Sequence, residues 1–376
     1  MKRLLPLFLL LLFAASCDGE GQNVHNGNET DTGQPADTHY LGDMESEDIP
    51  VEDPGPSFSN QLAWKVVDPG AVEVWNALTG MTYDDGAYEV YVGGGFGALA
   101  WFDSRDKKWR HANLPETLSI NSLWTDGPDY IVVAGEDGLL KRRFDFAENG
   151  TLDWYNDDLS TGVDTELDAV HGYDRKNLWA VGPGGTMLQF ANDTWTLHSL
   201  ADAGLPNNPP PDFTAVLALG PQKALITTAG MLVTYDAGTF TKDEVTFAGY
   251  KLRAIYDSGN AVWIAADKGT IFKSVDGGWE KHQANVYSQF KALWQSPEGV
   301  LFAAGTQTDP TVWTYDGNAQ DHWDYVPVES PKFIKDAYPH LRVDPASRIT
   351  GIWGTSDENA YVCTKEKQVV HYAIHP

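Results

Sequence analysis

The side chains best suited to hold a partner lie in one segment, residues 327–347. This segment concentrates cations and aromatic rings in a chain whose formal net charge is −27. The candidate binding residues are Lys332, Phe333, Lys335, Tyr338, His340 and Arg342. Aromatic side chains beside cations are common anchors of binding surfaces. The sequence therefore predicts a binding loop here, with the alternative that the aromatic residues merely pack the loop against the rest of the fold.

Residues for catalysis or metal binding are much harder to find. A sialidase would need three arginines that converge on a carboxylate, whereas arginines here are sparse and irregularly placed. The chain has no HExxH, paired CxxC, GxSxG or EF-hand pattern. The sequence thus predicts no catalytic residue, no metal ion and no cofactor. A glycan hydrolase or lyase is the alternative, and it would need two carboxylates about 5–10 Å apart at one site.

The acidic composition argues against nucleic acid as a partner. The chain has 26 Lys and Arg against 53 Asp and Glu, and neutralising phosphates requires clustered cations. We interpret the excess of carboxylates as an aid to solubility. The expected partner is therefore a protein or a glycan.

The elements that must position these residues are short strands that recur along the chain. In residues 167–200, four strand-like runs are separated by turns rich in Gly, Asn, Asp or Pro. An aromatic residue recurs near the start of each fourth strand, at spacings of 45, 45, 41, 45, 39 and 44 residues. These aromatics are Trp64, Trp109, Trp154, Trp195, Phe240, Trp279 and Trp323. A period of about 40–45 residues with four strands is typical of a β-propeller blade.

The first and second strands of the repeat support the same period. The second strands are apolar with small residues, as in residues 132–135 (VVAG) and 302–305 (FAAG). The first strands carry a Leu-Trp pair or its equivalent: Leu123-Trp124, Val170-His171, Val216-Leu217, Ile255-Tyr256, Leu293-Trp294 and Ile352-Trp353. In the first blade we take Val74-Trp75 as this pair. The sequence predicts an all-β, seven-bladed β-propeller with four-stranded antiparallel blades over residues 61–376.

The two ends of the repeat region are incomplete and complementary. Residues 62–67 form a fourth strand that precedes any complete repeat, and residues 349–374 contain only three strands. We expect residues 62–67 to pair with the outer edge of residues 369–372, so that one blade is built from both ends of the chain. This arrangement removes open sheet edges. The domain is expected to be monomeric, with Cys363 as a packing residue of a second strand.

The repeats resemble those of secreted bacterial propellers with YVTN-like or WD-repeat-like units, and of the photosystem assembly factor type. Residues 351–354 (GIWG) and 361–363 (YVC) carry this resemblance. Residues 274–279 (SVDGGW) resemble a BNR or Asp-box turn, which in that family is a structural hairpin between third and fourth strands. The resemblance implies architecture and no particular activity, because propellers host unrelated functions.

Several polar residues could be mistaken for metal ligands. His111, His198 and His282 follow fourth-strand aromatics by two or three residues, so we expect them at solvated outer edges of different blades. Asp84-Asp85-Gly86 could help to hold a calcium ion, although a plain polar turn is the favoured interpretation.

The N-terminal region predicts export. Residues 1–17 contain Lys2 and Arg3, an apolar run and the small residues Ala14-Ala15-Ser16 before Cys17. This pattern resembles a bacterial lipoprotein signal, which implies lipidation of Cys17 and a membrane-anchored protein on the periplasmic or cell-surface side. An ordinary secretory signal is the alternative. Residues 18–60 hold eleven acidic residues and no Lys or Arg, a composition typical of a disordered tether.

Three long loops are expected on one rim of the propeller, because fourth-to-first and second-to-third connections emerge on the same face. They are residues 201–212, 306–310 and 327–347. Long loops in compact domains are often functional. The sequence therefore predicts a membrane-anchored binding or assembly module that acts through this loop-bearing face, or a structural protein of the cell envelope.

Overall fold

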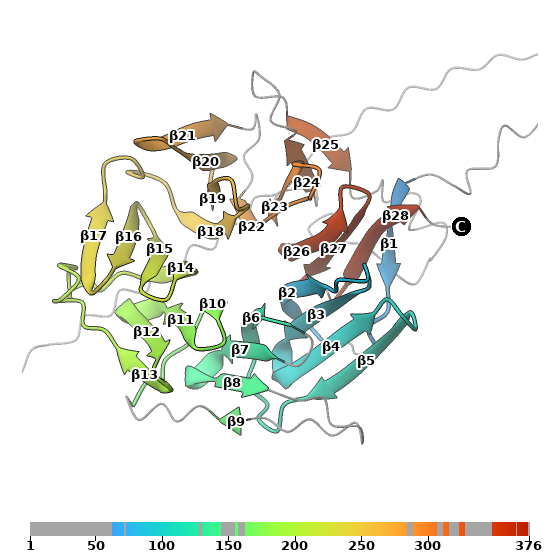
Figure 1. Ribbon diagram of the computed structural model, residues 1–376, viewed down its shortest axis with the longest axis horizontal. Coiled ribbons are helices and arrows are strands. Elements are labelled where there is room, and N and C mark those ends of the chain that lie inside the picture. The colour runs from blue at the N-terminus through green and yellow to red at the C-terminus, as the bar shows by residue number, and fades with distance from the viewer. Residues whose placement is uncertain are drawn as a thin grey trace, which may run out of the picture. The chain divides into compact units, whose positions relative to one another are not determined.

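The fold was analysed in a computed structural model, which describes residues 62–70, 73–127, 130–143, 155–156, 162–283, 289–306, 311–315, 323–327, 348–365 and 367–374. These residues form strands β1 to β28 and three short 3₁₀ turns (Figure 1). The strands make seven sheets of four, and every strand pairs antiparallel with its neighbours. The predicted all-β propeller with four-stranded antiparallel blades is therefore confirmed.

Each sheet runs from an inner strand to an outer strand. The inner strands are β2 (Trp75–Thr82), β6 (Ile120–Thr125), β10 (Ala169–Asp174), β14 (Phe213–Gly220), β18 (Leu252–Asp257), β22 (Gln289–Gln295) and β26 (Ile349–Ser356). The second strands are β3 (Tyr88–Gly94), β7 (Ile131–Gly135), β11 (Asn177–Gly182), β15 (Lys223–Thr228), β19 (Val262–Ala266), β23 (Leu301–Thr306) and β27 (Asn359–Thr364). The third strands are β4 (Ala98–Asp103), β8 (Leu140–Arg143), β12 (Thr186–Ala191), β16 (Met231–Asp236), β20 (Thr270–Val275), β24 (Thr311–Tyr315) and β28 (Val369–Ile374). The outer strands are β5 (Lys108–Asn113), β9 (Tyr155–Asn156), β13 (Thr194–Leu197), β17 (Thr239–Asp243), β21 (Gly278–Gln283), β25 (Trp323–Pro327) and β1 (Leu62–Val67). The 3₁₀ turns η1 (Gly95–Gly97), η2 (Glu136–Gly138) and η3 (Pro183–Gly185) follow second strands.

The inner strands pack against one another in a closed circle. Each contacts the inner strand of the next sheet, and β26 contacts β2 of the first sheet. The sheet that contains β26 takes its outer strand from the start of the repeat region, because β1 pairs with β28 from Leu62 opposite Ile374 to Val67 opposite Val369. Figure 1 shows β1 and β28 side by side, drawn in blue and red.

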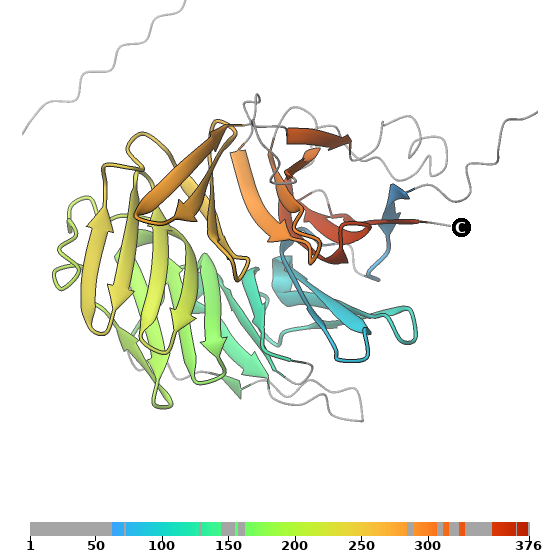
Figure 2. The ribbon, with the colours of Figure 1, turned by 45° about the horizontal axis from the view of Figure 1, so that its top comes forward.

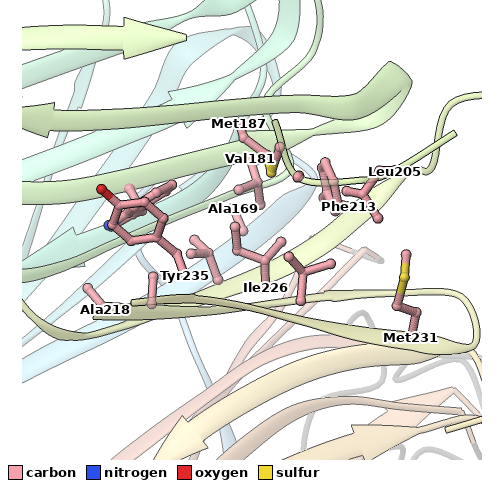
Figure 3. Close-up of a cluster of buried hydrophobic side chains, with 14 residues drawn as sticks. Ala169, Val181, Met187, Leu205, Phe213, Ala218, Ile226, Met231 and Tyr235 are labelled. Atoms are coloured by element: carbon pink, nitrogen blue, oxygen red, sulfur yellow. The ribbon is translucent and has the colours of Figure 1, made fainter. Parts of the chain in front are cut away.

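The sheets face one another around the ring (Figure 2). A cluster of buried apolar residues lies between each pair of neighbouring sheets. A representative cluster joins the sheets of β10–β13 and β14–β17 (Figure 3). There Val181 and Met187 of one sheet lie against Phe213 and Ile226 of the other, all buried. Burial of apolar surface stabilises the fold by roughly 25 cal/mol per Å², so the sheets are held together mainly by these interfaces.

The irregular first blade corrects one sequence prediction. Val74-Trp75 is not the equivalent of the Leu-Trp pair, because Trp75 begins β2 opposite Gly94 and is fully buried. Leu78 and Thr79 occupy the place of the pair in the ladder with β3. The strand β2 has eight residues, as do β14 and β26. Trp75 is the buried apolar residue that opens the strand, like Ile120 in the next blade. A tryptophan at this position imitates the Leu-Trp pair in the sequence.

Two polar turns are structural. Asp85 accepts a hydrogen bond from the backbone of Ala87 and lies 3.5 Å from Arg105, as expected for a plain turn between β2 and β3. The Asp-box-like segment forms the turn between β20 and β21, and the Ser274 hydroxyl accepts a hydrogen bond from the Val262 amide. Both turns therefore serve the fold. Within the described residues, no helix has the length and hydropathy needed to cross a membrane.

Candidate functional site

The same three-residue pattern of an apolar, a polar and a small residue stands at the start of each inner strand, and in the third blade its first two residues directly precede β10. The apolar residues are completely buried: Trp75, Ile120, Leu167, Phe213, Leu252, Phe290 and Ile349. The next residue lies in a β-bulge in six of the blades, where the ladder to the second strand skips one position. In the third blade Asp168 directly precedes β10 and donates its amide to Val181. Because a bulge re-aims the side chain of its extra residue, these polar residues reach the inner edge of the ring.

The seven polar residues converge on one hollow at the centre of the ring. We call them the bulge ring: Asn76, Asn121, Asp168, Thr214, Arg253, Lys291 and Thr350. Together with Glu166 and Lys365 they line a cavity of about 270 Å³. Since every blade contributes one member, this hollow is one mouth of the central channel. Its described lining contains no aromatic side chain.

Four uncharged members of the bulge ring tie adjacent blades together. We call them the stitching residues: Asn76, Asn121, Thr214 and Thr350. Each donates a side-chain hydrogen bond to the carbonyl of the buried apolar residue that opens the next inner strand. The acceptors are Ile120 at 3.0 Å, Leu167 at 3.4 Å, Leu252 at 2.8 Å and Trp75 at 2.9 Å, respectively. The bond from Thr350 to Trp75 joins the last blade to the first.

The other three members, Asp168, Arg253 and Lys291, are charged and do not make this bond. An ionised carboxylate has no proton to donate, so Asp168 cannot reproduce the bond. The side chains of Arg253 and Lys291 have no hydrogen bond or ion pair to any other described residue, and the buried Nε of Arg253 is without a hydrogen-bond partner there. These charges face the channel mouth instead of serving the blade interfaces.

The charges form two poles on different sides of the mouth. Glu166 and Asp168 belong to the third blade and make the acidic pole. Arg253, Lys291 and Lys365 belong to the fifth, sixth and seventh blades and make the basic pole. Three cations around one hollow stand out in a chain with a net charge of −27. The mouth is therefore a strongly dipolar site.

Both poles hold their charges against an unfavourable environment. Burial, reinforced by the negative charges of Glu166 and Asp212, raises the pKa of Asp168 to about 6, and Lys365 opposes this shift. Burial lowers the pKa of Lys291, and the nearby cations Lys365, Arg253 and Arg348 lower it further. Like charges thus crowd within each pole, and a ligand of opposite charge would relieve the repulsion.

The described loops place this mouth on the expected rim. Asp212, at the end of the insertion 201–212, accepts a hydrogen bond at 3.0 Å from Gly184 in the turn after β11. In the last blade the amide of Lys365, after β27, donates to the carbonyl of Arg348, just before β26, at 3.1 Å. Fourth-to-first and second-to-third connections therefore meet beside the bulge ring. The insertion 201–212 is anchored by buried Ala203 and Leu205, which fits its interpretation as a connector.

The candidate binding residues Lys332, Phe333, Lys335, Tyr338, His340 and Arg342 lie outside the described residues, as does Cys17. The connection that contains the six residues joins β25 to β26 and ends at Arg348, beside the basic pole. The bulge ring was not predicted from the sequence. Its signal is present in the triplets WNA, INS, LDA, FTA, LRA, FKA and ITG, which open the seven inner strands.

Two of the three predicted edge histidines are not solvated. His282 is buried and packs on Trp263, with ring centres 6.0 Å apart. His198 is half-buried, stacks on Trp179 at 5.2 Å and is 3.0 Å from Gln189 Oε1. The prediction was wrong because each imidazole covers the aromatic ring of a second strand. Only His111 is exposed as expected, and no group of His, Cys, Asp and Glu in the described ranges is arranged to hold a metal ion.

The neutral histidine of the first-strand pair is also structural. His171 accepts a hydrogen bond from the Ala218 amide at 3.2 Å and lies 6.1 Å from the ring of Trp124. Burial lowers its pKa to about 4. Cys363 is completely buried, and burial raises the pKa of its thiol to about 12. Neither residue belongs to the channel mouth.

Comparisons with known proteins identify the fold. No family model matches the chain, and no curated protein matches its sequence. Solved propellers match it in structure. "YCF48 bound to D1 peptide" gives a TM-score of 0.59 at 13% identity, covering 82% of this chain and 96% of that chain. The chain is a β-propeller. The WD40 β-propeller domain of Doa1 gives a TM-score of 0.62 at 11% identity, covering 84% and 97%.

A third neighbour comes from a larger protein. The extracellular domain of the putative hybrid two component system BT4673 from B. thetaiotaomicron gives a TM-score of 0.60 at 14% identity. The match covers 83% of this chain and 40% of that chain. At such identities the three likenesses show a shared architecture, and functional inference must come from the site.

Proposed function

We propose that this protein is an exported, membrane-anchored propeller that acts as a binding or assembly module through the face that carries the channel mouth. The observation that carries the proposal is the bulge ring. At three of its positions a hydrogen bond between blades is replaced by a charge that the described residues leave unpaired. Departures from a local structural rule concentrate at functional sites. The partner is a protein, with a glycan as the alternative.

The loop 327–347 is proposed as the outer part of the same binding surface. Its candidate residues Lys332, Lys335 and Arg342 would extend the basic pole, and Phe333 and Tyr338 would supply apolar anchors. Two structural neighbours lend support to this kind of function. One is described as bound to a peptide, and another is the extracellular domain of a larger protein.

Capture from an envelope extract tests the binding face. The full chain would be compared with a variant that carries Arg253→Glu and Lys291→Glu, and with the control variant Lys273→Glu. Lys273 is a half-buried cation on β20 in a separate hollow, 5.2 Å from the ring of Trp263. We expect partners to be lost with the double variant and kept with the control. Identical sets of captured proteins for all three chains would contradict the proposal.

Membrane anchoring is proposed through Cys17, and the acidic segment 18–60 is proposed as a tether. A diacylglyceryl group together with further acyl chains buries enough CH₂ groups for stable anchoring. Replacement Cys17→Ser should release the protein from the membrane fraction and abolish the incorporation of labelled fatty acid. An unchanged membrane fraction would contradict lipidation at this residue.

A second candidate function is favoured by one observation. Glu166 and Asp168 place two carboxylates at one mouth, and the raised pKa of Asp168, about 6, suits a general acid. A glycan hydrolase or lyase needs two carboxylates at one site. Incubation with a glycan panel decides between the candidates. A binding module releases no product, whereas an enzyme releases product that is lost in Asp168→Asn and Glu166→Gln.

A further inference from the structure

The two poles of the channel mouth define the chemistry of the ligand, and this inference rests on the proposed binding function. Arg253 and Lys291 come from neighbouring blades, and Lys365 comes from the next blade round the ring. The fork of a guanidinium together with ammonium groups is well suited to a carboxylate. The three cations repel one another. An anion that binds among them is attracted by each and also relieves this repulsion.

The acidic pole limits which anion can bind. Glu166 and Asp168 line the same hollow, and Asp212 lies close enough to raise the pKa of Asp168. A multiply charged anion such as phosphate would be repelled by this pole. A ligand that carries one carboxylate and one cationic group can satisfy both sides of the mouth. The crowding within the acidic pole would be relieved by that cationic group in the same way.

The size and lining of the hollow favour a peptide over a sugar. Its volume of about 270 Å³ suits a short piece of a peptide chain. The described lining is made of amide, hydroxyl, carboxylate and cationic side chains, with no aromatic face on which a sugar ring could pack. The second amide hydrogen and the side-chain oxygen of Asn76 can serve polar backbone groups of an extended chain. Asn121 donates to both Leu167 and Glu166, so it offers only its side-chain oxygen.

We propose that the channel mouth binds a peptide segment that places a carboxylate against Arg253, Lys291 and Lys365 and an ammonium or guanidinium group against Glu166 and Asp168. The carboxylate can be that of an acidic side chain or of a chain end, since the chemistry is the same. The site thus recognises a ligand that carries two opposite charges. A purely basic or purely acidic surface would instead recognise the net charge of the ligand.

Calorimetry with capped tripeptides and the full chain tests this proposal at low ionic strength, where charge interactions are least screened. The probes are Ac-Glu-Gly-Lys-NH₂, its two singly charged analogues with Gln in place of Glu or Lys, and the neutral Ac-Gln-Gly-Gln-NH₂. We expect the doubly charged peptide to bind at least about tenfold more tightly than either singly charged peptide. Ac-Lys-Gly-Gly-OH, with a free carboxylate only at its end, distinguishes the two sources of the anion.

Variants of the protein assign each pole to its ligand group. Lys291→Met should weaken the Glu-containing peptides and leave the Gln-Gly-Lys peptide unchanged. Asp168→Asn should do the reverse, and Lys273→Met should change nothing. Thermal melting confirms that each variant is folded. Equal binding of the doubly charged and the acidic peptides, or equal weakening of all peptides by Asp168→Asn, would overturn the inference.

The outcomes also separate this inference from the function on which it rests. If none of the peptides binds, yet capture from the envelope extract still depends on Arg253 and Lys291, the binding face stands and the dipolar selection is wrong. If capture is independent of both residues as well, the proposed function fails with it.

Discussion

The bulge ring contains two kinds of residue in equivalent positions. One kind bonds to the neighbouring blade, and the other places a charge at the channel mouth. Thr214 and Thr350 are small and uncharged, and each bonds to the neighbouring blade. Arg253 and Lys291 occupy the two blades between them and make no such bond to the described residues. All four uncharged members of the bulge ring form the blade-to-blade bond, so the residue type decides whether the bond is made. At the charged positions this bond is absent, so those side chains do not stabilise the blade interfaces in this way.

The comparison can be tested most strongly by making the whole ring uncharged. The triple variant Asp168→Asn, Arg253→Thr and Lys291→Thr should raise the free energy of unfolding by about 3 kcal/mol, because each change permits a new hydrogen bond and removes a crowded charge. Urea denaturation measures the gain. A triple variant less stable than the natural protein would mean that the opposite poles stabilise each other across the mouth.

The single variant Asp168→Asn isolates the acidic pole and has a defined pH dependence. The folded-state pKa of Asp168 is about 6, above the ordinary value of about 3.9 for an unfolded chain. The ionised carboxylate therefore destabilises the fold increasingly as the pH rises from about 4 to about 6. We expect the variant to gain about 2 kcal/mol at pH 7.5 and much less at pH 4. Equal gains at both pH values would show that the charge is not the cause.

Removal of a stitching residue should have the opposite sign. Thr350→Val keeps the shape of the side chain but deletes the donor to the Trp75 carbonyl. The expected loss is about 1 kcal/mol, since one buried acceptor loses a partner. Thr241→Val, at an exposed position of β17, is the matched control and should be nearly neutral. Thermal or urea unfolding of both variants measures the difference. Equal changes in the free energy of unfolding would show that the bond does not stabilise the fold.

The smallest effect is expected at the outer surface. Arg105 and Asp85 form an exposed ion pair at 3.5 Å. Arg105→Gln should leave the free energy of unfolding unchanged within the error of urea denaturation, because exposed pairs are well screened by water and salt. A clearly larger loss would show that exposed charges also affect the free energy of unfolding. The contrast between the channel mouth and the outer surface would then be weaker.

The architecture was predictable because its signals are local and repeated. Aromatic residues such as Trp195 and small second strands such as β11 recur at the blade period and follow the two-residue alternation of strands. The first blade was misaligned because its opening apolar residue is a tryptophan, Trp75, while Thr79 stands where most inner strands carry an aromatic residue. His198 and His282 were misjudged because each packs on the tryptophan of the second strand of its own blade, across the third strand, and the position of a histidine along the outer strand does not reveal this contact.

The candidate site was less predictable for a different reason. The members of the bulge ring are about one blade apart in sequence, and no single triplet, such as LDA at residues 167–169, looks functional. Only the closed ring brings Asp168 and Lys291 to one hollow. The loop 327–347, which has the most conspicuous composition, lies largely outside the described residues, so its part in the site stays a prediction.

The pairing of β1 with β28 has a consequence for the order in which the molecule can assemble. During synthesis β1 emerges before every other strand of the ring, and its partner β28 emerges last, 312 positions later as judged from Leu62 and Ile374. Such distant contacts slow folding, because a long stretch of chain must be ordered first. The nascent protein therefore carries β1 without its partner strand until translation is nearly finished. A prematurely terminated chain would lack β28, and its ring of blades would not close.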